Sequence, residues 1–400
     1  MPSNRHRSLG LLAILVSVVL ALAAQSARAC TIFVLTDANH ALFCNGEDWS
    51  TFDTRIWFQP AGKGYYGAVY VGFDNGWPQG GLNTEGLAYD WVMFYKEPTQ
   101  KGDPNLPATR GPACRRMLET CATVQEAVAF YRTHAEPAFG TSKILVADKT
   151  GASVIIGVKG GQLEVEESNQ SRGFGFGRRI LQTTLDRRAA LAEQPEPSVT
   201  EGFKILHDCR QAGEYATKYS NVFDLKSGDI FLRPFPERLD EVKLNLAVEL
   251  NKGDHYYEMP AITAQLAQAP RPLPMNMKRF PLDECNPIPD KEPKVTEHVR
   301  ALLLDVAQGT ARVEDYTADF WKSDVLPYRA QAREKLKRLG ELVSMTLVER
   351  GDANGQRSYR YRVELTNAWV LLRCVLDARN KVTLFTGEDE EWKPAPPNRR

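Results

Sequence analysis

The sequence lacks the short motifs that mark most metal, nucleotide and serine-hydrolase sites. It has no His-Glu-x-x-His, no Cys-x-x-Cys and no Gly-x-x-x-x-Gly-Lys followed by Ser or Thr, the motifs of zinc proteases, thiol-based metal or redox sites and phosphate-binding loops. Gly-x-Ser-x-Gly, typical of α/β hydrolases, is also missing. The six histidines are scattered without metal-ligand spacing. We therefore expect no bound metal and no cofactor.

Long apolar runs are missing as well, with one exception near the start. A run from Leu9 to Ala24 follows two arginines and precedes Ala27-Arg28-Ala29, which is the order of a secretory signal peptide. The run is about 16 residues long, shorter than the roughly 20 that cross a bilayer. We expect residues 1–29 to be removed, giving a periplasmic or secreted protein without a membrane span. A lipid anchor is disfavoured because Arg28 stands where lipoprotein signals carry a small residue.

An excess of charge of either sign is absent too. The chain has 50 basic and 50 acidic residues, so it offers no electrostatic reason to bind nucleic acid or an anionic membrane. Seven cysteines in an exported chain permit disulfides. If Cys30 stays free, six remain, and their pairing cannot be deduced from sequence. We expect Cys114 and Cys121 to pack in the core, because two helical turns separate them by about 10 Å.

The order of predicted elements indicates layered α+β structure. β-branched, apolar segments with intervening turns predict strands in residues 30–94, 143–165 and 219–232. Helical spacing predicts helices over 112–121, 124–134, 179–195 and 200–211. Strands, two helices, strands, helices and strands in this order favour α+β over alternating βαβ units.

Proline divides the chain into two parts. Seven prolines occur between Pro270 and Pro293, a density that opposes helices and sheet interiors and predicts an extended linker. Beyond it, two predicted helices and four alternating strands form a small α+β module. The predicted organisation is a signal peptide over 1–29, a catalytic domain over 30–268, a linker over 269–294, a C-terminal module over 295–393 and a disordered tail over 394–400.

Cleavage after Ala29 would make Cys30 the first residue, and this gives the cysteine a special chemistry. The thiol is a nucleophile, and the α-amine of the same residue can accept its proton. Their reference pKa values lie near 8.5 and 8, so the pair can operate near neutral pH without histidine. The same logic is used by N-terminal threonine nucleophiles. The cleavage site and the nucleophile are therefore expected to coincide.

Three stretches resemble the choloylglycine hydrolase and penicillin V acylase family. They are Cys30-Thr-Ile-Phe, Phe43-Cys-Asn-Gly-Glu-Asp-Trp49 and Gly81-Leu-Asn-Thr-Glu-Gly-Leu87. Ala216-Thr-Lys-Tyr-Ser-Asn-Val-Phe-Asp is similar to a late strand hairpin of that group. The resemblance spans residues 30–262 and implies the four-layer αββα sandwich of N-terminal nucleophile hydrolases.

The resemblance also implies roles for particular residues. Cys30 would be the nucleophile, Asp48 would hold its α-amine, and Asn83 would help to bind the tetrahedral oxyanion together with a backbone N–H. Asn45 stands where the family usually has an arginine beside the nucleophile, and Lys218 is the nearest candidate for a late cation; we assign both to substrate binding.

Two further features of the sequence bear on the site. Asn169 is the nearest substitute for a second oxyanion asparagine, although its setting is more typical of an ordinary loop residue. Gly173-Phe-Gly-Phe-Gly lacks the spacing of a nucleotide loop. We expect its glycines to permit close backbone approach instead.

The resulting expectation is a hydrolase of linear amides that acts on a small N-acyl substrate through an acyl-thioester. Two alternatives remain open. One is acyl transfer to an amine, as in acyl-CoA:6-aminopenicillanate acyltransferases. The other is a catalytically impaired binding protein on the same fold, because the expected arginine is missing. The sequence leaves a homo-oligomer open.

Overall fold

The computed structural model describes most of the chain beyond the predicted signal peptide. The predicted signal peptide, the middle of the linker and the predicted tail lie outside the described residues, as does Cys285. The described residues are 30–93, 106, 109, 111–175, 177–191, 193, 195–235, 241–278, 286–353 and 355–393.

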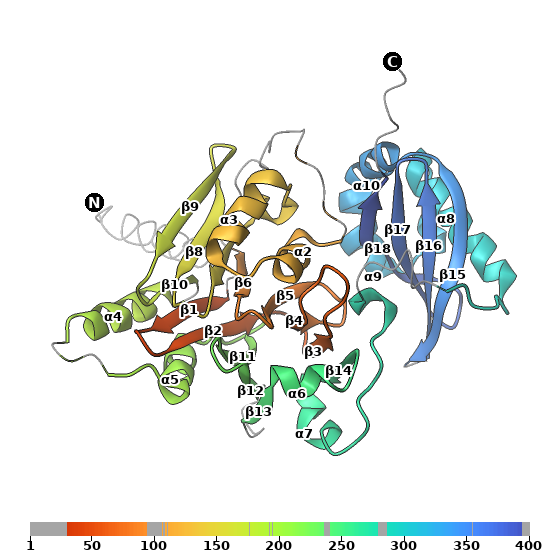
Figure 1. Cartoon of the computed structure of the whole chain (residues 1–400). Helices are drawn as coiled ribbons and strands as arrows, with labels where there is room; N and C mark the ends of the chain where they lie inside the picture. The colour runs from red at the N-terminus through yellow and green to blue at the C-terminus, as the bar shows by residue number, and fades with distance from the viewer. Residues whose placement is uncertain are drawn as a thin grey trace, which may run out of the picture.

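Two antiparallel sheets form the first domain (Figure 1). The first sheet has the order β10-β1-β2-β11-β12-β13. Its strands are β1 (Thr31–Thr36), β2 (Ala41–Asp48), β10 (Arg172–Gly175), β11 (Thr217–Asp224), β12 (Asp229–Pro234) and β13 (Val242–Asn245). β1 therefore lies between β10 and β2, and the residue just before it is Cys30.

The second sheet is larger and has the order β14-β3-β4-β5-β6-β7-β8-β9. Its strands are β3 (Thr54–Gln59), β4 (Ala68–Phe73), β5 (Pro78–Asn83), β6 (Ala88–Met93), β7 (Ser142–Ala147), β8 (Ser153–Lys159), β9 (Gln162–Ser168) and β14 (His255–Glu258). The sequence predicted most of these strands but neither β14 nor β5, whose Gly80 and Gly81 have low strand propensity. A Cβ at Gly81 would collide with Val69 O and Leu118, so the glycine is required by close packing.

Helices cover the outer face of each sheet, which gives four layers. α2 (Ala113–Thr120) and α3 (Val124–Thr133) pack on the second sheet, while α4 (Arg178–Ala189) and α5 (Val199–Cys209) pack on the first. α3 and α5 begin with hydroxyl caps: Thr123 and Ser198 accept the backbone N–H three residues on, as helix N-termini require. The implied αββα sandwich is confirmed.

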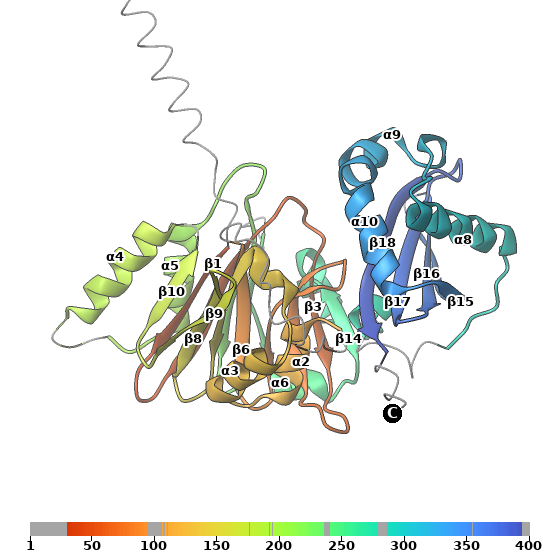
Figure 2. The ribbon, with the colours of Figure 1, turned by 90° about the horizontal axis from the view of Figure 1, so that it is seen from above.

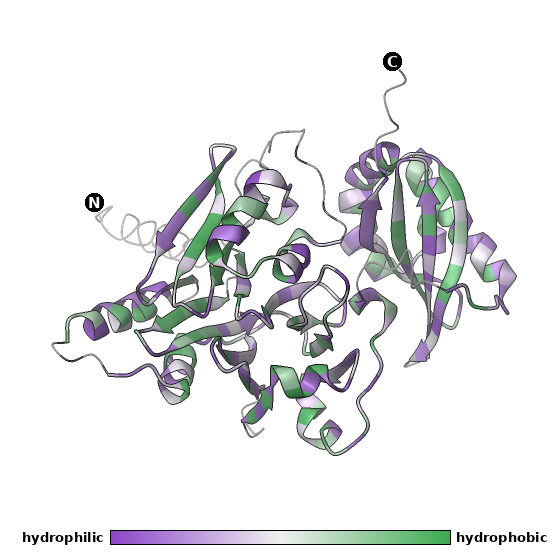
Figure 3. Cartoon of the chain, viewed as in Figure 1, coloured by the Kyte–Doolittle hydropathy of each residue, from purple (hydrophilic) through white to green (hydrophobic). Residues whose placement is uncertain are grey.

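Apolar side chains fill the spaces between the layers. Strand alternation sends Ile32 and Val34 toward the second sheet, where they join a cluster with Phe43, Ile56 and Leu145. Phe33 and Leu35 point the other way, against α4 and α5. Figure 3 shows apolar residues concentrated on the central strands and polar residues on the outer helix faces. Cys30 belongs to the cluster between the sheets.

A second α+β domain follows, as predicted. Its four strands pair in chain order: β15 (Leu342–Ala353), β16 (Gln356–Leu365), β17 (Ala368–Leu376) and β18 (Val382–Trp392). One face of this sheet packs on α8 (Pro293–Gln308) and α10 (Leu326–Leu339). The short turns α9 (Ala318–Phe320) and Trp321–Val325 precede α10.

Short elements complete the first domain and lead to the second. They are α6 (Leu246–Leu250), α7 (Ile262–Gln265) and the 3-10 turns Pro137–Gly140, Met259–Ala261 and Met275–Met277. The first described stretch of the proline-rich segment, residues 270–278, packs on both domains: Leu273 and Met277 join the core beside α2, and Met275 contacts the cluster around Leu371. The second described stretch, residues 286–292, is largely exposed. Figure 2 shows the second domain beside β3 and β14.

The described cysteines form no disulfide with one another. Cys30, Cys44, Cys114, Cys121, Cys209 and Cys374 are all free and buried, and Cys114 and Cys121 lie in the core as expected. No helix among the described residues is long and apolar enough to cross a membrane. Within those same residues, no group of three or more His, Cys, Asp or Glu side chains could hold a metal ion.

The glycine-rich run lies against the start of β1, and its composition predicted such a close approach. Gly175 pairs with Thr31 and Gly173 with Phe33. Gly175 has a φ of 131°, and a Cβ there would collide with the carbonyl oxygen of Cys30. These glycines therefore let β10 close on the residue that carries the proposed nucleophile.

We expect Gly175→Ala to lower the free energy of unfolding by about 1–3 kcal/mol, the usual cost of forcing extra volume into a packed region. Gly161→Ala is the matched control, because Gly161 also has a positive φ but nothing within 4 Å of an added Cβ. Urea denaturation of both variants measures the difference. Equal losses would show that backbone strain, and not the approach to Cys30, sets the requirement.

Candidate active site

Cys30 is held inside the molecule at the start of β1. The residue is only 8% exposed, and the register of β1 with β2 continues to place it opposite Glu47. Burial is the largest cause that raises the pKa of its thiol well above the usual value, and the charges of Glu47 and Asp48 raise it further. A hydrogen bond with the backbone of Asp48 acts in the opposite direction. In the unprocessed chain the thiol is therefore protonated at neutral pH.

Asp48 ends β2, and its charge acts on the Cys30 thiol. Its Oδ1 accepts a hydrogen bond of 2.6 Å from Thr217 Oγ1, and Thr217 is its partner across β11. Burial raises the pKa of Asp48 to about 7, although the Thr217 hydrogen bond and the Lys218 charge both lower it. Asp48 is thus a carboxyl that can change its protonation near neutral pH.

Lys218 reaches the same region through an irregularity in β11. Thr217 pairs with Asp48 and Tyr219 with Glu47, so Lys218 is the extra residue of a β-bulge. Bulges redirect side chains and are frequent beside active sites. The Lys218 Nζ lies 4.1 Å from the centre of the Phe52 ring, and burial lowers its pKa while Asp48 opposes that shift.

Asn45 faces the interior rather than an open cleft. It is completely buried, and its Nδ2 donates to Asn221 Oδ1 at 3.3 Å. Asn45 pairs with Asn221 across β2 and β11. Its Oδ1 and the Nδ2 of Asn221 make no further hydrogen bond within the described part of the chain, so both amides keep one polar atom available near Cys30.

The side chain of Asn83 is not brought to Cys30. Its Nδ2 donates to Leu118 O and Cys121 O at 2.7 and 2.8 Å, and its Oδ1 accepts the N–H groups of Glu85 and Leu87 at 3.0 Å. Its backbone N–H is bonded to Leu87 O. The side chain follows Gly81 toward α2, so the second sheet separates it from Cys30. The implied oxyanion role has no geometric support; the amide instead ties a turn to the end of α2.

Asn169 also stays apart. It is exposed in the turn after β9, which agrees with the ordinary loop interpretation.

The loop after Asp48 contributes two partly exposed aromatic side chains, Trp49 and Phe52. Trp49 packs on Phe73 with ring centres 5.6 Å apart. This loop gives the neighbourhood of Asp48 an apolar surface.

Sequence reasoning missed Glu47, Asp90 and Tyr219. All three are buried, and the charges of Glu47 and Asp90 act on Cys30. Burial raises the pKa of Glu47 to about 8; burial and the Glu47 charge raise that of Asp90 well above its usual range. A sequence signal did exist for Asp90, which is a carboxyl inside an otherwise apolar strand, where a charge is costly unless it has a function. The signal for Glu47 was weaker, because Asn45 and Asp48 share its strand.

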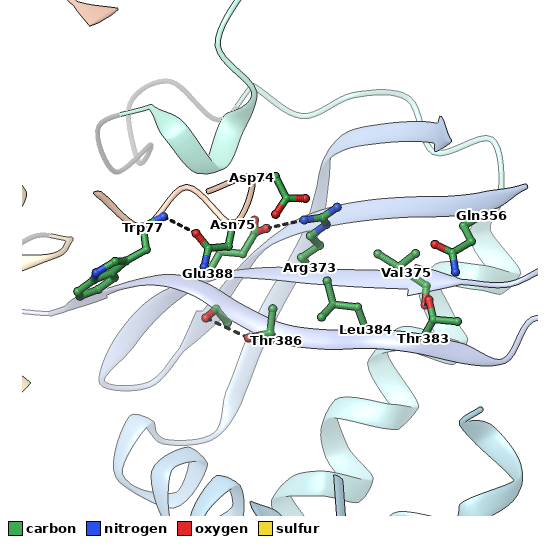
Figure 4. A pocket seen from close by; sticks show the side chains of 11 residues that line it. Asp74, Asn75, Trp77, Gln356, Arg373, Val375, Thr383, Leu384, Thr386 and Glu388 are labelled. Atoms are coloured by element: carbon green, nitrogen blue, oxygen red, sulfur yellow. Dashed lines mark hydrogen bonds and ion pairs between the residues drawn. The ribbon is translucent and has the colours of Figure 1, made fainter. Parts of the chain in front are cut away.

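The hollow shown in Figure 4 lies elsewhere. Asp74, Asn75 and Trp77, from the turn after β4, face Arg373 and Glu388 of the second domain. The cavity has a volume of about 540 Å³. Its polar lining is largely paired, because Arg373 contacts Glu388 at 3.5 Å and Asn75 accepts from the Trp77 N–H at 3.0 Å. Cys30, Asp48 and Lys218 are not among its lining residues.

Comparison with known proteins finds similarity only at the level of solved structures. No family model and no curated protein matches the chain. Penicillin V acylase from Agrobacterium tumefaciens is 16% identical with a TM-score of 0.45, over 55% of this chain and 86% of that one. Two variants of conjugated bile acid hydrolase from Clostridium perfringens are 15% identical with TM-scores of 0.45 and 0.46, over 57% of this chain and 95% of theirs.

We predict that Asn83→Ala destabilises the protein, because four partners lose hydrogen bonds in a buried place. Each buried group left unsatisfied costs about 1–3 kcal/mol. Denaturant titration should show a loss of several kcal/mol, whereas Asn169→Ala, at an exposed loop position, should change stability by less than about 0.5 kcal/mol. An Asn83→Ala protein with unchanged stability and a lost kcat would restore the oxyanion role.

Asp48 should make the unprocessed chain less stable as pH rises. Its folded pKa of about 7 lies above its unfolded value of about 3.9. Its stabilising contribution is therefore fully present below pH 4 and is lost as pH rises to 7. The size of the loss is roughly 1.4 kcal/mol for each unit by which the folded and unfolded pKa values differ. Comparing unfolding free energies of wild type and Asp48→Asn at pH 4.5 and 7.5 checks this. The variant should show the shallower decline, and parallel curves would contradict the assignment.

Proposed function

We propose that the protein is an exported amide hydrolase whose mature chain begins with the nucleophile Cys30. The observation that carries the proposal is the coincidence of two features at one residue. Cys30 directly follows a signal-type cleavage pattern, and it is the buried residue that leads into a central strand beside Asp48 and Glu47. An N-terminal residue in that place combines a nucleophile with its own base.

The first half of the reaction forms an acyl-thioester. The Cys30 sulfur attacks the carbonyl carbon of the amide, and the thiol proton passes to the α-amine. When the tetrahedral intermediate collapses, the C–N bond breaks and the ammonium returns that proton to the leaving amine. Asp48 orients the α-amine, since its carboxyl lies beside Cys30 and is itself held by Thr217.

The second half releases the acid. Water attacks the thioester carbonyl and gives a proton to the α-amine, the C–S bond breaks, and the thiol regains the proton. The candidate donors to the oxyanion are Asn221, whose Nδ2 makes no hydrogen bond among the described residues, and the bulge residue Lys218, rather than Asn83. The unused atom of Asn45 is its Oδ1, which is an acceptor, so Asn45 instead holds Asn221 in place. The partly exposed Trp49 and Phe52 favour a small N-acyl amide with an apolar acyl group. No cofactor takes part in this scheme.

The test is the intact mass of the exported protein after exposure to a panel of N-acyl amides. We expect a chain that starts at Cys30, an acyl adduct in wild type and no adduct in Cys30→Ala. Adding amine acceptors separates hydrolysis from acyl transfer, because transfer would yield a new amide. A mature chain that starts elsewhere would contradict the mechanism, since the base would no longer be an α-amine. A correct start without any adduct would favour a binding protein.

A further inference from the structure

Two buried carboxyls beneath Cys30 have no positive partner in the described structure. Glu47 is on β2 and Asp90 on β6, so they come from opposite sheets and meet in the interface between them, where β2 contacts β6. Glu47 is 2% and Asp90 0% exposed. Glu47 Oε2 and Asp90 Oδ2 form no hydrogen bond among the described residues. Buried carboxyls are normally paired, so this cluster is incomplete.

The groups around Glu47 show what is missing. Cys30 faces it from β1, Asp48 follows it on β2, Asp90 faces it from β6 and the phenol of Tyr219 faces it from β11. Tyr219 OH is buried and makes no hydrogen bond among the described residues. Lys218 is the nearby cation, but its charge acts on Asp48. Within the described part of the chain, the ionisable groups that face Glu47 itself are thus all acids.

Glu47 and Asp48 also point in different directions. Glu47 follows Phe43 and Asn45 on the face of β2 that looks toward the second sheet. Asp48 follows Cys44 and Gly46, which face α5, and its Oδ1 is already occupied by Thr217. The register of β1 with β2 continues to place Cys30 opposite Glu47, and the interaction with the Cys30 thiol lowers the pKa of the Glu47 carboxyl. Of the two carboxyls, Glu47 is the one that faces the interior on the Cys30 side.

We propose that Glu47 is a second positioning residue for the nucleophile, in addition to Asp48: it holds the Cys30 thiol in the unprocessed chain and shares the α-ammonium of Cys30 with Asp48 after residues 1–29 are removed. This inference rests on the proposed function, which supplies the free α-amine. The new ammonium gives the acidic cluster the positive charge it lacks, and Asp90 stays protonated beside the pair. Removal of residues 1–29 therefore changes the electrostatics of the site as well as exposing the base.

The pKa values fit this sequence of events. Before processing, burial holds the pKa of Glu47 at about 8, so the carboxyl is neutral at pH 7. An ammonium in contact favours the ionised form and lowers the pKa of a carboxyl by about 1–3. The ion pair in turn raises the pKa of the α-ammonium, which strengthens the amine as the acceptor of the thiol proton.

The experiment measures the pH dependence of Cys30 alkylation by iodoacetamide, in protein whose start at Cys30 has been verified by mass. Wild type, Glu47→Gln, Glu47→Asp and the control Glu136→Gln are compared, and peptide mass spectrometry assigns the modified site. Glu136 is a suitable control because it is also buried, 2% exposed, with a pKa raised to about 7 by burial.

We expect Glu47→Gln to lower the alkylation midpoint by about one pH unit or more, because a neighbouring negative charge that hinders proton loss is gone. The alkylation midpoint of Glu47→Asp should lie only a few tenths of a pH unit below that of wild type, and the midpoint of Glu136→Gln should equal that of wild type. With a substrate in hand, Glu47→Gln should lower kcat roughly tenfold or more with little change in KM, as expected for a misplaced nucleophile.

An unchanged midpoint in folded Glu47→Gln would overturn the proposal and leave Glu47 a packing residue. If Glu47→Gln is not recovered in folded form, Glu47→Asp decides. An alkylation midpoint lowered by a few tenths of a pH unit in Glu47→Asp supports the proposal, and an unchanged midpoint contradicts it. The titration needs no turnover. A wild-type protein that acylates no amide would therefore count against the proposed function while the role of Glu47 is still measured.

Discussion

The antiparallel pairing of β1 with its two neighbours is the constraint on which the rest of the site depends. Because side chains alternate along a strand, the register that opposes Thr31 to Gly46 and Gly175 also fixes where Cys30 and Glu47 lie. A slip of one residue in this register would turn Cys30, Ile32 and Val34 away from the interface between the sheets and toward the helix layer that contains α5. The apolar interface between the sheets therefore stabilises the register, and the register places Cys30 opposite Glu47.

Desolvation gives this arrangement its chemical character. The carboxyls of Glu47, Asp48 and Asp90 all have a raised pKa, and burial is the largest cause in every case. The same burial raises the pKa of the Cys30 thiol. A site built in this way suppresses the reactivity of Cys30 until a positive charge enters it. Under the proposed function, removal of residues 1–29 would bring such a charge to this place as the α-ammonium of Cys30.

The sequence predicted those parts of the molecule that depend on local pattern. The helices over 112–134 and 179–211 were readable from their periodicity, whereas the roles of Cys30 and Asp48 came from the family resemblance and stay predictions. β5 was missed because Gly80 and Gly81 are poor strand residues whose value lies in tight packing against Asp90 and Leu118. Tertiary contacts overrode propensity there.

The side-chain roles show the same limit. An asparagine followed by Thr-Glu-Gly suggested oxyanion binding, but the alternation of the strand turns Asn83 toward α2. There its Nδ2 donates to two backbone carbonyl oxygens at the end of the helix. The meeting of Glu47 with Asp90 requires the packing of one sheet on another, and it joins residues that are 43 positions apart in the sequence. No local pattern encodes such a contact; only the presence of carboxyls in apolar strands hinted at it.

The position of the C-terminal domain bears on how the site is reached. Both ribbon views show this domain beside β3 and β14, with β1 and β10 on the far side of the first domain. It is attached there by Leu273 and Met277 on one side and Met275 on the other. This arrangement argues against a lid over Cys30, because the domain would have to leave its packed linker to reach β1. The exposed aromatic side chains that follow Asp48 come instead from the first domain itself, where the loop after β2 carries Trp49 and Phe52.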